Sequence, residues 1–280
     1  ADMNGLVLVH RLAKGGEKWV QVAALQEVEE VLWVKAHATA NYFAFGAQDG
    51  SVWVYQIEEL TVSQLMSGFS HSLECNAGVF IREKEENELS LVTISEDGLI
   101  VCWNCFQGTP VWKLAPFDFK GSENPWVTIS VNGNVLACGA RNGELAIIHE
   151  SGRLVNLVKT LDSVEDEADL SIEALSWCKA LPLLAVGLVS GDVLFFETQQ
   201  WRIRHRIQIE DTVTKLVFGE GAEVFGLSMD GCVYKWDART GQELFKGVGH
   251  NMGVLDFALV EKNSKVVTAG DEGVSLVFQV

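Results

Sequence analysis

Basic residues are scarce in this chain. Its 280 residues include 38 Asp and Glu but only 21 Lys and Arg, which gives a formal net charge of −17 at pH 7. A charge of this sign repels nucleic acid and anionic lipid and attracts basic partners. We therefore expect no direct nucleic-acid binding and a basic partner, although acidity that only aids solubility is the plain alternative.

Long apolar runs are missing as well. No stretch approaches the ~20 apolar residues that a membrane span needs, and no secretory signal is recognisable. The six cysteines are scattered along the chain, which is typical of a reduced protein and not of a disulfide scaffold. The sequence predicts a cytoplasmic protein that does not contact a membrane.

Catalytic signatures are absent too. The sequence has no P-loop and no GxGxxG motif, and Ser130 and Ser176 lie outside any nucleophile elbow. Cys102 and Cys105 have C-x-x-C spacing, but they lie on or beside an expected strand and no second pair has metal-ligand spacing. We expect no enzyme activity, no metal or other cofactor, and no small-molecule substrate.

What the chain does have is an internal repeat of turns. Short polar turns ending in glycine recur every 40 to 48 residues, at Gly5, Gly50, Gly98, Gly143, Gly191, Gly231 and Gly273. Asn-Gly and Asp-Gly between β-rich runs are strong hairpin signals. Five residues after the glycine, five of the seven cycles carry an aromatic residue: Tyr55, Trp103, Phe196, Trp236 and Phe278.

Two families of short apolar runs accompany these turns. One family, such as "YFAFGA" and "VLACGA", precedes the glycine directly, and Gly46 within it is expected to let neighbouring strands approach closely. The other family is "VEEVLWV" (28–34), "WVTISV" (126–131), "IEALSW" (172–177), "VTKLVF" (213–218) and "VLDFALV" (254–260). About four short strands per cycle predict an all-β fold, a WD40-type β-propeller of four-stranded blades.

The repeat also predicts how the blades are divided. We expect one β-propeller domain over 1–280, with half a blade at 1–25, five full blades at 26–252, and a last blade at 253–280 that lacks its outer strand. This amounts to about six and a quarter blades. The count predicts a chain that is cut inside a blade, with upstream residues completing the first blade and closing the ring.

Carboxylates collect in the segments that join the blades. Residues 161–177 carry six acids and no base between Asp162 and Glu173, and such connections are expected on one face together with the glycine turns. The residue just before each glycine (Asp49, Asp97, Asp230, Glu272) is expected to be structural. The candidate binding residues on this acidic top face are Glu29, Glu30, Glu96, Asp166, Glu173, Asp211 and Asp271. A solvated carboxylate is the plain alternative for each one.

Several stretches resemble one family of WD propellers. "QEVEEVLWVKAH" (26–37), "GHNMGVLDF" (249–257) and "TAGDEGVSLVF" (268–278) are similar to the fungal Sqt-type ribosome-assembly chaperones, relatives of the angio-associated migratory cell protein. The resemblance implies an eight-bladed propeller in the intact protein. It also implies a partner, the basic N-terminal segment of newly made large-subunit ribosomal protein L-ten (uL-sixteen), bound during its synthesis.

Two functions remain open at this point. The first is a dedicated, non-catalytic chaperone for a basic ribosomal protein, and its binding should weaken with salt. The second is a WD-repeat scaffold for another complex, such as a ubiquitin ligase adaptor, with apolar and salt-indifferent contacts.

Overall fold

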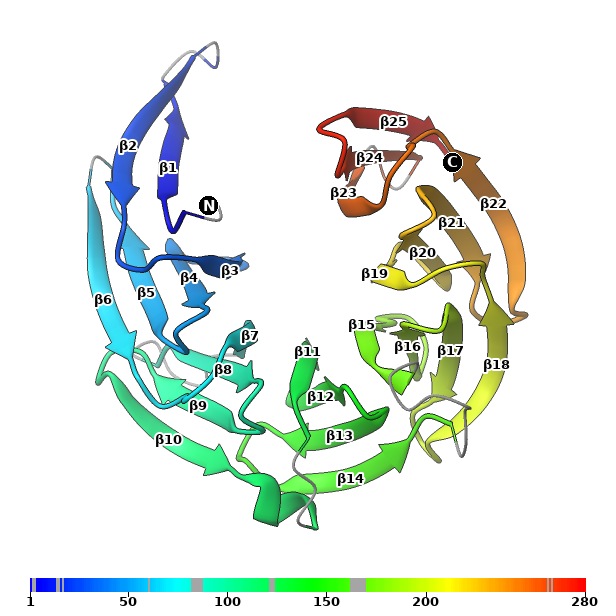
Figure 1. The fold of residues 1–280 in the computed structure, drawn as a ribbon, viewed down its shortest axis with the longest axis horizontal. Helices are drawn as coiled ribbons and strands as arrows, with labels where there is room; N and C mark the ends of the chain where they lie inside the picture. The colour runs from blue at the N-terminus through cyan, green and yellow to red at the C-terminus, as the bar shows by residue number, and fades with distance from the viewer. Residues whose placement is uncertain are drawn as a thin grey trace. The chain divides into compact units, whose positions relative to one another are not determined.

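The strands follow one another in chain order and pair with their neighbours (Figure 1). The computed structural model describes residues 1, 4–13, 16, 18–59, 61–81, 88–120, 124–161, 170–260, 262 and 264–280. The chain forms two compact units. The first comprises Ala1–Ile129, Gly133–Val135 and Ile148–Leu154, and the second comprises Ser130–Asn132, Leu136–Ile147 and Val155–Val280.

The first unit holds three antiparallel sheets among its described residues, with strand orders β1-β2, β3-β4-β5-β6 and β7-β8-β9-β10. Their bounds are β1 (Val7–Leu12), β2 (Trp19–Leu25), β3 (Val31–Ala36), β4 (Tyr42–Ala47), β5 (Val52–Ile57), β6 (Val62–Gly68), β7 (Cys75–Ile81), β8 (Ser90–Ser95), β9 (Ile100–Asn104) and β10 (Thr109–Leu114). A short 3-10 turn, η1 (Pro116–Phe119), follows β10.

The second unit holds the sheets β15-β16-β17-β18, β19-β20-β21-β22 and β23-β24-β25. Their bounds are β15 (Ile172–Trp177), β16 (Leu183–Leu188), β17 (Asp192–Glu197), β18 (Arg202–Gln208), β19 (Val213–Phe218), β20 (Glu223–Ser228), β21 (Cys232–Asp237), β22 (Gln242–Val248), β23 (Val254–Val260), β24 (Lys265–Gly270) and β25 (Ser275–Gln279). A further four-stranded sheet contributes residues to both units: β11 (Trp126–Asn132), β12 (Val135–Ala140), β13 (Glu144–His149) and β14 (Leu154–Lys159).

The prediction of an all-β fold with four-stranded WD-type blades is confirmed. The expected strands at 126–131, 172–177, 213–218 and 254–260 become β11, β15, β19 and β23. The expected strand at 28–34 is displaced, because β3 begins at Val31. Its first three residues, including Glu29 and Glu30, lie in the connection that precedes β3.

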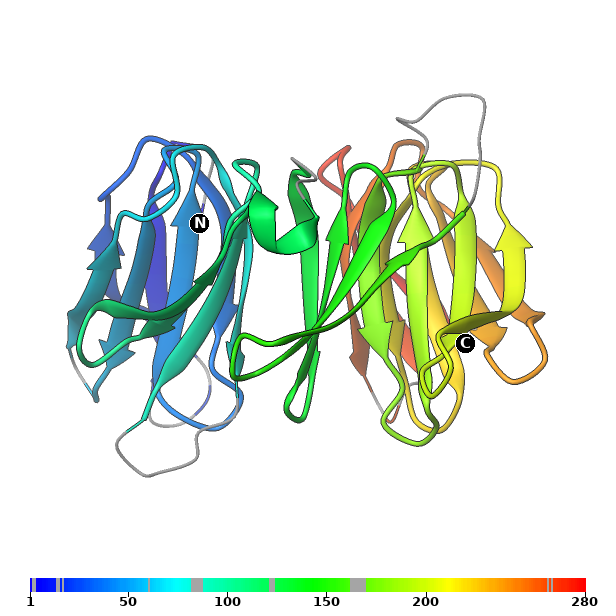
Figure 2. The same cartoon turned by 90° about the horizontal axis from the view of Figure 1, so that it is seen from below.

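The order of the strands decides which loops share an end of each sheet. In a four-stranded antiparallel meander, the second strand returns to the end at which the first began, and so does the fourth. The glycine turn between the second and third strands and the connections to neighbouring sheets therefore lie at one end, which we call the turn end. The hairpins that join the first strand to the second, and the third to the fourth, lie at the opposite end of each sheet (Figure 2). At the turn end Gly50 and Gly231 have φ of +80°, a conformation that side chains disfavour.

Close approach between first strands explains a second glycine. The Trp33 indole of β3 donates a hydrogen bond to the Cys75 carbonyl of β7 at 2.9 Å. A Cβ on Gly46 would lie 2.2 Å from the indole nitrogen, and a Cβ on Gly78 would lie 2.2 Å from the same ring. The predicted role of Gly46 is confirmed, since only glycine leaves room for this ring between the two sheets.

A buried polar network fixes the sheet β7–β10. The Trp103 indole donates to Thr93 Oγ1 at 2.9 Å, and Thr93 Oγ1 lies 2.8 Å from His71 Nε2. His71 Nδ1 faces Asp97 Oδ1 at 3.6 Å, and the backbone N–H groups of Ser72 and Leu99 donate to the same carboxylate. The hydroxyl thus joins the turn end to the third strand. Only part of this network recurs in β23–β25, where Phe278 replaces the tryptophan beside Thr268 and His250.

Removing the Thr93 hydroxyl tests this network. Thr93→Val leaves the indole N–H and the imidazole nitrogen buried without their shared partner, which costs about 1–3 kcal/mol per unsatisfied group. We expect urea unfolding to show that loss, and the exposed Thr61→Val control to stay within about 0.5 kcal/mol of wild type. Equal stability of the two variants would contradict the role assigned to Thr93.

The Asp97 carboxylate makes the stability of the first unit depend on pH. Burial opposes its ionised form, but the nearby His71 imidazole and the hydrogen bonds from the Ser72 and Leu99 backbone outweigh burial and hold the pKa of Asp97 well below its ordinary value. A lowered pKa in the folded state contributes stability above the unfolded value near ~3.9, and that contribution disappears as the pH falls through the folded pKa. We expect Asp97→Asn to lower the melting temperature at pH 7 and the difference from wild type to shrink steadily below about pH 4. A difference that stays constant over this acid range would refute the assignment.

Candidate functional site

The glycine turn of each sheet is tied to the connection that enters the same sheet. The N–H of the residue two before the glycine donates to the carbonyl of the residue just before the first strand. This bond recurs from Gln48 to Glu30, Glu96 to Glu74, Val189 to Ser171, Met229 to Thr212 and Asp271 to Gly253, at 2.9–3.2 Å. Side chains of the two loop sets are thereby brought together at the turn end of each sheet, as the strand order requires.

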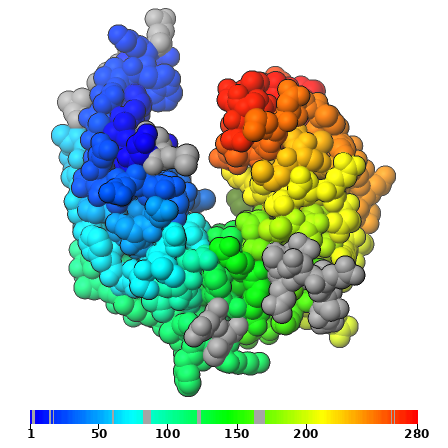
Figure 3. All heavy atoms as spheres, in the orientation of Figure 1, coloured from blue at the N-terminus to red at the C-terminus, as the bar shows by residue number. Residues whose placement is uncertain are grey.

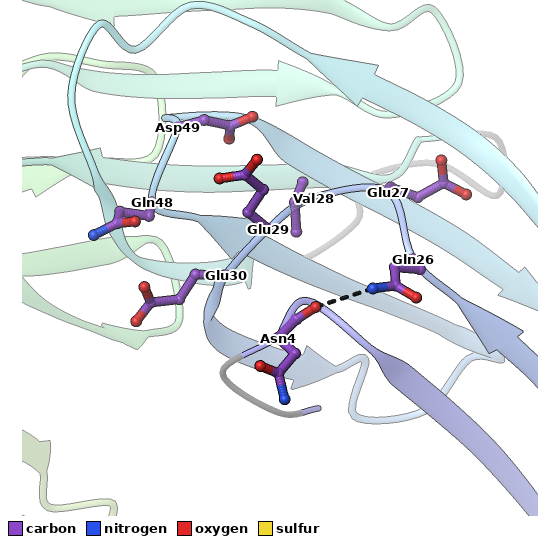
Figure 4. A pocket seen from close by; sticks show the side chains of 8 residues that line it. All are labelled: Asn4, Gln26, Glu27, Val28, Glu29, Glu30, Gln48 and Asp49. Carbon is purple, nitrogen blue, oxygen red and sulfur yellow. Dashed lines mark hydrogen bonds between the residues drawn. The ribbon is translucent and has the colours of Figure 1, made fainter.

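The first unit has an open hollow at this end, with a volume of about 960 Å³ (Figure 4). Its lining is polar except for one residue, and half of it is acidic: Asn4, Gln26, Glu27, Val28, Glu29, Glu30, Gln48 and Asp49. The Gln26 amide closes one side by donating to the Asn4 carbonyl at 3.2 Å. The connection before β3 and the turn after β4 thus place four carboxylates around one hollow.

Two of those four carboxylates have structural partners. Glu27 Oε1 accepts a hydrogen bond from the Tyr55 hydroxyl at 3.2 Å. Asp49 Oδ1 accepts from the Ser51 backbone and hydroxyl at 2.9 and 2.6 Å. Among the described residues, the side chains of Glu29 and Glu30 make no hydrogen bond or ion pair, and Glu29 is exposed. These two predicted residues are the carboxylates of the hollow that remain available to a ligand.

The turns separate structural from available acids as the sequence predicts. Asp97, Asp230 and Glu272 stand directly before their glycines and bind neighbouring groups of the fold. Asp230 accepts from the Tyr234 hydroxyl at 2.8 Å, and Glu272 lies 2.6 Å from the His250 imidazole. One residue earlier, Asp271 is exposed. Glu96 is half-buried and accepts from the Asn76 amide at 3.1 Å, so it is less free than predicted.

In the second unit, Glu173 occupies a bulge of β15. The pairing register of β15 with β16 shifts between Ile172 and Ala174, so that Glu173 has no direct partner. The same shift follows the first residue of four other first strands, at Leu32, Asn76, Thr214 and Leu255. A bulge re-aims its side chain and leaves it outside the regular alternation of faces.

Most polar residues at the bulge connect neighbouring sheets. Thr214 Oγ1 donates to the Val254 carbonyl at 3.1 Å, and the Asn76 amide donates to the Trp126 carbonyl at 2.9 Å. Both acceptors open the first strand of the next sheet. An ionised Glu173 cannot donate, because a carboxylate only accepts. Its Oε1 accepts from the Ser171 hydroxyl at 2.6 Å instead. Glu173 therefore cannot make the bond between sheets that Thr214 and Asn76 make, whereas Leu32 and Leu255 at the same position carry no polar side chain.

The register corrects one equivalence in the sequence interpretation. In the expected strands 28–34 and 172–177, Glu29 follows Val28 and Glu173 follows Ile172, so the sequence alone predicts matching positions for the two acids. The position that matches Glu173 is Leu32, because Val31 and Ile172 open their strands. Glu29 lies in the connection, two residues before β3, and its counterpart in the second unit is Asp211, two residues before β19.

The remaining predicted residues divide between the units. Asp211 is exposed in the connection before β19, and Asp271 is exposed in the turn between β24 and β25. Asp166 and most of the acids of segment 161–177 lie outside the described residues. Glu29, Glu30 and Glu96 belong to the first unit, and Glu173, Asp211 and Asp271 to the second. That they form one acidic face for a single ligand stays a prediction.

Other chemistries find little support in the described part of the chain. It contains no group of three or more His, Cys, Asp or Glu placed to hold a metal ion. Cys102 and Cys105 are buried free thiols, and burial raises the pKa of each to about 12. Among these residues there is also no helix long and apolar enough to cross a membrane.

Comparison with known proteins finds relatives that match along the whole chain. No family model matches it. Its sequence is 49% identical to the ribosome assembly protein SQT1 of Saccharomyces cerevisiae, over 100% of this chain and 70% of that protein. It is 27% identical to the human angio-associated migratory cell protein, over 100% of this chain and 64% of that protein.

Solved structures agree with the sequences. The crystal structure of Saccharomyces cerevisiae Sqt1 matches with a TM-score of 0.94 at 47% identity, over 100% of this chain and 80% of the solved one. Chaetomium thermophilum Sqt1 bound to the N-terminus of the ribosomal protein L10 matches with a TM-score of 0.86 at 27% identity, over 99% and 79% of the two chains.

The bulge offers a direct test of what Glu173 costs the fold. Glu173→Thr places a hydroxyl where Thr214 has its own, so that it can donate to the first strand of the next sheet. Glu173 also accepts from the buried Ser171 hydroxyl, so the change is made in a Ser171→Ala background in which no hydroxyl loses its acceptor. There we expect the free energy of unfolding to rise by about 0.5–1.5 kcal/mol, the net value of one hydrogen bond. The matched variant Thr214→Glu should lose at least as much. Urea denaturation measures both, and a destabilised Glu173→Thr would show that the carboxylate is itself structural.

Proposed function

Because the chain belongs to the Sqt1 family of ribosome assembly proteins, we propose that it is a dedicated chaperone for large-subunit ribosomal protein L10 (uL-sixteen). It binds the basic N-terminal segment of that protein on carboxylates at the turn ends of its sheets. It acts by binding and not by catalysis. The relative that is solved with the N-terminus of L10 supports this choice of partner.

The main support for an acidic binding surface is that some carboxylates are hydrogen-bonded within the fold while others are exposed. Asp97 and Asp230 are held by the fold, whereas Glu29, Asp211 and Asp271 are exposed at the turn ends of their own sheets. Glu173 even occupies a position where a hydrogen-bond donor serves the fold elsewhere. Exposed acids at the turn ends, in a chain with a net charge of −17, favour a cationic ligand.

Electrostatic attraction also favours capture of the partner while it is being synthesised. One exposed ion pair contributes only ~0–1 kcal/mol. Carboxylates around one hollow act together, because the Debye length of ~8 Å at physiological salt spans neighbouring loops. Such a surface captures a basic segment quickly, as soon as it leaves the ribosome. We therefore place the encounter in the cytoplasm, during synthesis of the partner.

Charge reversal at the turn end tests the proposed function. Asp271→Lys and Glu173→Lys should each weaken binding of the L10 N-terminal segment roughly tenfold at low salt, because an attraction becomes a repulsion. The control is Glu220→Lys, which makes the same charge change in the exposed hairpin between β19 and β20, at the opposite end of its sheet. Fluorescence anisotropy at low and physiological salt measures the affinities.

The same titration separates the two candidate functions. A chaperone for a basic segment loses affinity as salt rises, and the gap between Asp271→Lys and Glu220→Lys narrows with it. If the wild-type chain does not bind the segment at low salt, the proposed function is wrong and a scaffold role takes its place. If both variants bind as wild type does, the partner is retained but the assigned carboxylates are wrong.

A further inference from the structure

Two exposed methionines lie side by side at the turn end of the second unit. Met229 stands two residues before Gly231 and is 44% exposed, and Met252 lies in the connection before β23 and is 50% exposed. The turn carrying Met229 rests on this connection. A Cβ built on Gly231 would lie 2.9 Å from the Met252 carbonyl, and one built on Gly253 would lie 2.8 Å from the Met229 sulfur. We call Met229 and Met252 the methionine pair.

The methionine pair is flanked by two candidate carboxylates. The Met229 N–H donates to the Thr212 carbonyl at 3.0 Å, next to the exposed Asp211. On the other side, the Asp271 N–H donates to the Gly253 carbonyl at 3.0 Å, next to Met252. The path Asp211, Met229, Met252, Asp271 therefore runs along the turn ends of two successive sheets, with acids at its ends and methionines between them. In the surface view, the orange and red segments of the last sheets reach solvent (Figure 3).

Such a pair is not explained by packing. The chain has only four methionines, and Met66 is buried with 3% exposure. Single exposed apolar side chains are ordinary on protein surfaces. Two exposed, flexible thioethers on adjoining loops that come from different sheets offer an adaptable apolar surface of the kind that proteins use for recognition.

We infer that the methionine pair is an apolar subsite for one aromatic side chain of the bound basic segment, with Asp211 and Asp271 pairing with cations on either side of it. The inference rests on the proposed function and adds to it a preference for residue type. Charge complementarity identifies the occupant, because an apolar partner without cations would leave both carboxylates facing it unpaired. An aromatic ring suits the pair, since methionine sulfur makes favourable contacts at ring edges.

The subsite has an electrostatic consequence. Contacts with Asp211 and Asp271 weaken as salt rises, because the charges are exposed and screened. Burial of a ring against two thioethers does not depend on ionic strength in that way. The methionine pair therefore gives the complex a component of affinity, and a register, that persists in salt.

The test is a double-mutant cycle between the chain and its ligand. The chain variant is Met229→Ser with Met252→Ser, and Leu244→Ser is the control, because Leu244 is 47% exposed on β22 in the same unit. The ligand is the L10 N-terminal segment, with each aromatic residue changed to Ser in turn. We expect the double variant to bind the parent segment roughly tenfold more weakly at low and at physiological salt. Its loss should not add to the loss from one particular aromatic substitution.

A second variant moves the thioether without changing any exposed charge. Gly253→Ala introduces a Cβ that displaces the end of the Met229 side chain, a flexible group that can shift at little cost to the fold. Affinity should fall several-fold while the melting temperature stays close to that of wild type. Met229→Leu should bind the segment with nearly wild-type affinity, because leucine keeps the subsite apolar.

The outcomes keep the two proposals apart. If wild type binds the segment and the methionine variants bind as tightly as Leu244→Ser, the subsite is refuted and the proposed function stands. Losses that add to those of every aromatic substitution also refute it, since no ring then contacts the pair. If wild type does not bind the segment at all, the proposed function fails, and the subsite fails with it.

Discussion

The antiparallel order of four strands is the constraint on which the site depends. It returns the second and fourth strands of each sheet to the end where the first began, so that glycine turns and connections share that end. One backbone hydrogen bond then ties each turn to the connection entering its sheet. Residues as distant in sequence as Gln48 and Glu30, or Met229 and Thr212, become neighbours through this bond. The backbone performs the positioning, which leaves the side chains at these positions free to vary.

That freedom explains the mixture of residues found at equivalent positions. The residue two before the glycine is an acid in some sheets, Gln48 in another and Met229 in yet another. All of them make the same backbone contact. Directly before the glycine, the side chain has a duty in the fold, and acids there bind neighbouring groups. The separation between a structural and an available carboxylate is thus a difference of one residue along a turn. It follows from which of the two side chains faces the sheet.

Sequence reasoning reached the strands and the turns because both have local signals. Glycine with positive φ and apolar runs of five to seven residues predict where β11, β15, β19 and β23 lie. The bulges could not be predicted, since a residue that leaves the alternation of faces has no sequence signature of its own. For this reason the sequence alone gives Glu29 and Glu173 matching positions. The approach of Met229 to Gly253, and the partners of Glu27 and Glu96, are tertiary facts that no pattern in one sequence encodes. The acids of segment 161–177, including Asp166, remain a prediction.

The bulge of β15 shows where binding and stability compete. At the same position Thr214 and Asn76 each donate a hydrogen bond to the next sheet, whereas Glu173 can only accept and turns to Ser171. A sheet that keeps a carboxylate here forgoes a contact worth about 0.5–1.5 kcal/mol. Residues that disregard a local rule of their fold are expected mainly at functional sites. Within the proposed function, a ligand explains an acid at this position better than solubility does, because an exposed position on an outer strand would serve solubility without displacing such a donor.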